Sequence, residues 1–224
     1  MTDEARARFI DQWTIEFVRT YPHPIERVWR AVTDPAEVAI WFIRPTVWEP
    51  QTGGAYRFHD DNFAGVVQAV EPPRLIRFGP RADTAADVWP GADSYFQFEL
   101  APVAGGTRLC YLQHAAPGVA DPDEPDPDFV SPGRPGALAG WHAAFDELGY
   151  RLGGTPLRER LPPTRLTEIA RNWASMDWSA EFTPQQKKRI IIGLRARERW
   201  FDYVDLYRDH VRATRPRATQ TQET

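Results

Sequence analysis

Hydrophobic and polar side chains alternate along several short stretches of the chain, the pattern of strands that bury one face. In residues 13–21, Trp13, Ile15, Phe17 and Arg19 share one face, and the residues between them share the other. Further strands are expected near 46–49, 54–59, 63–71, 74–79, 93–101 and 106–114, separated by Gly, Pro or Asp. This succession predicts an antiparallel meander.

Two short helices are predicted between the first strand and the meander. Pro24 fits a first helical turn, and the apolar residues of 25–32 follow at the spacing of an amphipathic helix. Asp34 caps the second helix, Pro35 occupies its first position, and Glu37 completes a capping box. The order of strand, two helices and meander is uncommon.

A longer helix is predicted over 138–152, where apolar residues step by three and four until Gly153 and Gly154 end it. We expect this helix to lie across the concave sheet. The preceding segment, 117–136, is rich in Pro and Asp and is interpreted as a mobile loop with the position of a lid.

The C-terminal part differs in charge from the rest of the chain. Residues 187–217 hold ten basic and four acidic side chains, whereas 1–186 hold 17 Arg and 26 Asp or Glu. A helix is predicted over about 183–210, with aromatic residues that must pack on something: its own domain, or the same helix of a second copy in a homodimer. Three parts are therefore expected: a domain over 1–154, a helical extension over 155–213, and a disordered tail over 214–224.

Five motifs recur in the same order in one protein family. They are PIERVWRAVTDPAEVAIWF (24–42), the pair Gly53 and Gly54, GVVQAVEPPRLIRF (65–78), GGTRL (105–109), and Gly140 with Trp141. On these motifs the chain resembles the START-like superfamily, in the branch related to the C-terminal domain of the activator of Hsp90 ATPase, over roughly residues 10–154. The resemblance implies an α+β helix-grip fold of the Bet v 1/START-like type, in which a curved antiparallel sheet wraps around a long C-terminal helix.

Aromatic side chains fall on the elements expected to border the space between this sheet and helix. The candidate cavity residues are Trp41, Phe42, Trp48, Tyr56, Phe58, Phe63, Phe78, Trp89, Phe96, Phe98, Tyr111, Gln113, Trp141 and Phe145. Such rings fill a core without needing a ligand, but a mostly apolar pocket with few polar groups is also typical of a small-molecule site. Relatives often carry a histidine where Gln113 stands; His114 is offset by one residue and faces the opposite side of its strand.

Catalytic and metal-binding patterns are scarce. The five histidines show no metal-ligand spacing, His142 is expected to face away from the cavity, and the single Cys110 is interpreted as a structural thiol. We therefore expect no metal and no cofactor. No apolar run reaches the length of a membrane span, and the charged N-terminus MTDEARARFI does not fit a signal peptide, so a cytoplasmic location with neither membrane nor nucleic-acid partners is expected.

Three function classes follow. The leading hypothesis is a non-catalytic module that binds a hydrophobic or aromatic small molecule. The resemblance implies the second, a co-chaperone of Hsp90, and also the third, a polyketide cyclase or aromatase in which His59, Arg57 and Gln113 assist the reaction. Arg57 and Arg77 are the candidates for an anionic ligand group, although strand alternation assigns both to the solvent face.

Overall fold

The computed structural model describes residues 6–58, 64–80, 93–115, 135–153, 206–207, 210–211 and 213–214. The elements are, in chain order, β1 (Arg8–Phe9), β2 (Thr14–Tyr21), α1 (Ile25–Thr33), α2 (Pro35–Trp41), β3 (Pro45–Trp48), β4 (Ala55–Phe58), β5 (Ala64–Glu71), β6 (Leu75–Gly79), β7 (Tyr95–Val103), β8 (Gly106–His114) and α3 (Pro135–Arg151). The strands and helices predicted within the described residues are present with closely similar bounds. The short β1, which pairs with Glu16 and Ile15 of β2, was not predicted.

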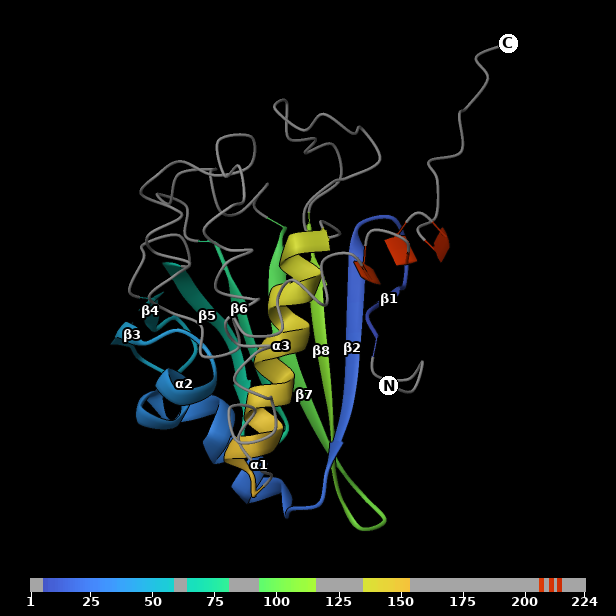
Figure 1. Cartoon of the computed structure of the whole chain (residues 1–224). Coiled ribbons are helices and arrows are strands. Elements are labelled where there is room, and N and C mark those ends of the chain that lie inside the picture. Colours follow the sequence, from blue (N-terminus) through green and yellow to red (C-terminus); the bar gives the residue numbers. More distant parts are fainter. Residues whose placement is uncertain are drawn as a thin grey trace, which may run out of the picture.

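The strands form one antiparallel sheet of eight strands in the order β1-β2-β8-β7-β6-β5-β4-β3. Figure 1 shows α3 lying across one face of this sheet, with α1 and α2 at one end of it. Strand alternation directs the apolar set of β2, Ile15 and Phe17, toward α3, and both side chains are fully buried. The predicted helix-grip α+β fold is confirmed.

The helix α3 has the apolar stripe that its sequence predicts. All five stripe residues are buried: Leu138, Trp141, Phe145, Leu148 and Leu152. After α3, Gly153 has a positive φ of 116°, a conformation that glycine tolerates because it lacks a Cβ. The predicted stop at this glycine is therefore confirmed.

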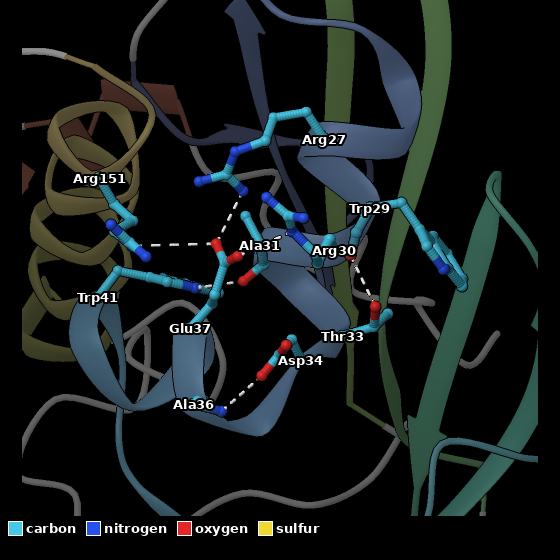
Figure 2. A network of polar contacts seen from close by, with 10 residues as sticks. All are labelled: Arg27, Trp29, Arg30, Ala31, Thr33, Asp34, Ala36, Glu37, Trp41 and Arg151. Atoms are coloured by element: carbon cyan, nitrogen blue, oxygen red, sulfur yellow. Dashed lines mark hydrogen bonds and ion pairs between the residues drawn. The ribbon is translucent and has the colours of Figure 1, made fainter.

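The start of α2 differs from the predicted capping box. Asp34 Oδ1 accepts a hydrogen bond from the Ala36 amide at 2.8 Å, so the side-chain cap itself is present. The Asp34 N–H, which Glu37 would have to bind, already donates to the Arg30 carbonyl at 2.9 Å and ends α1. The predicted bond from the Glu37 side chain to the Asp34 N–H is therefore wrong. The Glu37 carboxylate binds arginines instead (Figure 2).

The described C-terminal residues pack on the same domain. Tyr207 and Val211 are buried in the hydrophobic core, and the Tyr207 ring lies 6.2 Å from that of Phe17 on β2. The Tyr207 hydroxyl is 2.8 Å from His142 Nδ1 on α3 and accepts a hydrogen bond from the Ala7 amide at 3.1 Å. His142 is thus buried beneath this segment. The predicted lid and most of the helix predicted over about 183–210 lie outside the described residues, so the homodimer stays a prediction.

Candidate functional site

Aromatic rings from both layers meet between the sheet and α3. Strands β4, β6, β7 and β8 contribute Tyr56, Phe58, Phe78, Phe96, Phe98 and Tyr111, while α2 and its C-cap contribute Trp41 and Phe42, and α3 contributes Trp141 and Phe145. All of these are buried, and Trp48 of β3 is partly buried against them. Phe63 and Trp89, the other two predicted cavity rings, lie outside the described residues.

The rings contact one another across the two layers. Phe42 and Trp141 stack at 4.7 Å with an interplanar angle of 11°, and Tyr111 lies 4.3 Å from Trp141 between ring centroids. Within the sheet, Phe78 and Phe96 stack at 4.7 Å and 19°. Such distances are those of packed aromatic pairs, so these rings contribute to the hydrophobic core whether or not a ligand binds.

Two indole groups are fixed by the backbone of α1. Trp41 Nε1 donates to the Ala31 carbonyl at 2.8 Å, and Trp48 Nε1 donates to the Thr33 carbonyl at 2.6 Å. Their N–H groups are therefore satisfied outside the aromatic cluster, and their apolar ring surfaces remain for packing inside it. No sequence pattern indicated these two bonds.

A polar pair stands within this apolar set on β8. Tyr111 Oη donates a hydrogen bond to Gln113 Oε1 at 3.0 Å, and burial, followed by the nearby Tyr56, raises the pKa of Tyr111 well above its ordinary value. The hydroxyl therefore stays protonated and can donate, as it does here to the Gln113 carbonyl oxygen. The amide NH₂ group is then directed away from Tyr111 as a hydrogen-bond donor.

The neighbouring His114 lies on the opposite face of the sheet. Its ring stacks on Tyr95 at 5.5 Å, and its Nδ1 is 2.8 Å from Thr14 Oγ1. The one-residue offset predicted from strand alternation is what the structure shows, with Gln113 rather than His114 beside the interior tyrosine.

The two predicted anion-binding arginines do not enter the interior. Arg57 is exposed. Arg77 lies on the outer face, where its guanidinium covers the Tyr95 ring at 4.5 Å and its Nε donates to Gln97 Oε1 at 2.6 Å. His59 lies outside the described residues.

Among the described residues, Arg19 is an arginine that faces inward, and the sequence reasoning did not select it as a site residue. Its guanidinium carbon lies 5.7 Å from the ring centroids of Phe17 and Phe145. The signal was present in the sequence, because Arg19 continues the inward alternation of Ile15 and Phe17 on β2.

The described residues carry few other groups with chemistry of their own. Burial, and then a hydrogen bond to Glu16, raises the pKa of the Cys110 thiol to about 12, which leaves it protonated and unreactive at neutral pH. Across the described ranges, no three His, Cys, Asp or Glu side chains gather as they would to hold a metal ion. Within the same residues, no helix is both long and apolar enough to cross a membrane.

Fold and aromatic interior together define the class of this protein, a START-like helix-grip protein. Residues 22–154 match the family model described as Activator of Hsp90 ATPase homolog 1-like protein, and the chain belongs to this family.

The chain is also similar to solved structures. One is the crystal structure of CalU16 from Micromonospora echinospora, with 19% sequence identity, coverage of 87% of this chain and 88% of that chain, and a TM-score of 0.48. Another is protein MLL2253 from Mesorhizobium loti, with 26% identity, coverage of 64% of this chain and 99% of that chain, and a TM-score of 0.47. No curated protein matches the chain.

Proposed function

We propose that this protein binds a hydrophobic or aromatic small molecule between the inner face of the sheet and α3. The observation that carries the proposal is the Gln113 amide, held at the edge of the aromatic cluster by Tyr111. An apolar interior with a few oriented polar groups is typical of small-molecule sites. The same two features suit a planar ligand that carries a hydrogen-bond acceptor.

The rings alone do not distinguish a ligand site from a core, because each buries a large apolar area in either case. Gln113 is the feature that favours a ligand site. It is only partly buried, and within the described part of the chain its NH₂ group donates to no residue. A leucine at this position would extend the apolar cluster at lower cost in desolvation, so an oriented amide favours recognition over packing.

The experiment is native mass spectrometry of the purified protein, followed by denaturation and analysis of the released small molecules. We expect a discrete added mass that is lost on denaturation. Gln113→Leu is expected to reduce its occupancy, whereas Gln68→Leu, which changes an exposed strand glutamine, is the matched control. An unliganded mass, together with no binding by a panel of polycyclic aromatic ketones, would contradict the proposal.

A second candidate function follows from the family match, whose description names the activator of Hsp90 ATPase. On this hypothesis the chain is a co-chaperone, and adding it to Hsp90 raises the ATPase rate. An unchanged rate would remove this candidate without affecting the first.

The cyclase or aromatase hypothesis has less support. Of its three candidate groups, Gln113 faces the interior, Arg57 is exposed, and His59 lies outside the described residues. It therefore stays a prediction without a described acid or base.

A further inference from the structure

Three arginines surround the Glu37 carboxylate where α1, α2 and the last turn of α3 meet (Figure 2). Arg27 Nη1 donates to Glu37 Oε2 at 2.7 Å, and Arg30 Nε donates to Oε1 at 3.0 Å. Arg151 stays 3.9 Å from Oε2 with its Nε, which is beyond hydrogen-bond distance. Within the described residues, the three arginines have no ion-pair partner other than Glu37.

The fold needs fewer than three arginines at this carboxylate. The Glu37 side chain is only 11% exposed, and its short bond to Arg27 already pairs this largely buried charge. The side chains of Arg30 and Arg151 are 61% and 39% exposed. Because exposed ion pairs add little to stability, packing alone does not account for these two arginines.

Arg30 and Arg151 instead present hydrogen-bond donors to solvent. Arg30 uses its Nε on Glu37, which leaves its two terminal NH₂ groups, and the Arg151 side chain makes no hydrogen bond to any described residue. A guanidinium with unused N–H groups binds a carboxylate through two parallel hydrogen bonds. Since Glu37 already holds the two groups near one another, little freedom is lost when a partner binds them.

The charge of the remaining surface decides between the possible anionic partners. The chain has a net charge of −4, and residues 1–186 hold 17 Arg against 26 Asp or Glu. A nucleic acid or an anionic membrane presents an extended array of phosphates, which an acidic body repels outside this one basic spot. A short segment with a few carboxylates needs no wider basic surface.

We propose that Arg30 and Arg151 form a docking site for a short acidic segment of a partner protein, one that places two Asp or Glu side chains next to each other. Each of the two arginines binds one carboxylate of the segment, while Arg27 keeps Glu37 in place between them. Trp141, which borders the proposed small-molecule site, lies about 15 Å away along α3. The inference therefore does not rest on the proposed function.

Fluorescence anisotropy with fluorescein-labelled hexaglutamate tests this docking site. We expect the wild-type protein to bind the peptide, and added salt should weaken the binding. Arg30→Gln combined with Arg151→Gln should raise Kd about threefold to thirtyfold, because two partly exposed ion pairs are lost. The matched control is Arg57→Gln combined with Arg108→Gln, which removes the same charge from two exposed arginines on the outer face of the sheet. It should leave Kd within about twofold of the wild-type value, since salt screens distant charges.

The other outcomes would overturn the proposal. They are no binding of hexaglutamate to the wild type, and an equal rise in Kd for the two double variants, which would reflect net charge alone. Tighter binding of oligothymidylate or of phosphatidylserine vesicles than of hexaglutamate would assign the surface to phosphate groups instead.

A measurement on the wild type decides the question if the Arg30→Gln, Arg151→Gln variant does not fold. In NMR spectra, hexaglutamate should shift the side-chain Nε–H resonances of Arg30 and Arg151 and leave that of Arg108 in place. Shifts confined to other arginines would place the peptide elsewhere and overturn the proposal.

Discussion

The Glu37 carboxylate joins three elements of the fold and offers a direct test of how α1, α2 and α3 are held together. Arg27 Nη1 donates to Glu37 Oε2 at 2.7 Å, and Arg30 Nε donates to Glu37 Oε1 at 3.0 Å. Arg151, in the last turn of α3, approaches Oε2 to 3.9 Å with its Nε. Figure 2 shows the three arginine side chains around this single carboxylate.

The magnitude expected for Glu37→Ala follows from the exposure of each partner. The Glu37 side chain is 11% exposed and that of Arg27 is 23% exposed, so this pair counts as a charge-assisted hydrogen bond of about 1.5–3 kcal/mol. Arg30 is 61% exposed, so its pair adds only about 0.2–1 kcal/mol. The expected loss is about 2–4 kcal/mol, which for a domain of this size lowers the thermal midpoint by about 5–15 °C.

Thermal and urea unfolding followed by circular dichroism measure this loss. Glu26→Ala is the matched control, because Glu26 also lies in a first helical turn but is exposed, and we expect it to change stability by less than about 0.5 kcal/mol. Glu37→Gln, which keeps the shape but not the charge, should fall between the two. Equal midpoints for Glu37→Ala and Glu26→Ala would refute the assignment of the three arginines to this carboxylate.

Three further predictions concern other parts of the core. Burial gives the folded Cys110 thiol a pKa of about 12, against about 8.5 when unfolded, so its contribution to stability is lost as the pH rises through this range. The midpoint of urea unfolding should therefore fall from pH 8 to 9 to 10. Rapid alkylation of the native thiol at pH 8 would contradict the raised pKa. Gly65→Ala places a Cβ against the Gly79 carbonyl oxygen of the neighbouring strand and should destabilise the protein by about 1–3 kcal/mol. Gly140→Ala in α3 meets no atom within 4 Å and should stabilise it by about 0.5–1 kcal/mol. Differential scanning calorimetry compares the two thermal midpoints, and equal changes in midpoint would argue against the close strand contact. Tyr207→Phe removes the acceptor of the Ala7 amide and should lower the free energy of unfolding by about 1–2 kcal/mol. Hydrogen exchange at the Ala7 amide should accelerate. Unchanged protection of this amide would show that the contact is not maintained in solution.

Local periodicity was sufficient for most of the fold. Strand alternation identified the sheet, and the three-and-four spacing over 138–152 identified α3, because both patterns follow from which face each element buries. The same reasoning placed Gln113 on the inner face and His114 on the outer face. Whether the aromatic set encloses a ligand was not predictable, since a packed core and a cavity wall require the same residue types.

What periodicity missed depends on contacts between distant parts of the chain. The Ala7–Tyr207 bond joins residues 200 positions apart, and no local pattern identifies such a pair. The capping box failed for a related reason: the Asp34 N–H already serves the end of α1, so Glu37 was available to Arg27 and Arg30. Here tertiary contacts override a local motif.

The C-terminal segment and the inward arginine are linked by their position in the fold. Tyr207 covers Phe17 and His142, and Phe17 in turn lies against the Arg19 guanidinium. Tyr207 and Val211 are both buried in the hydrophobic core, so the described part of the extension contributes to the packing of the domain.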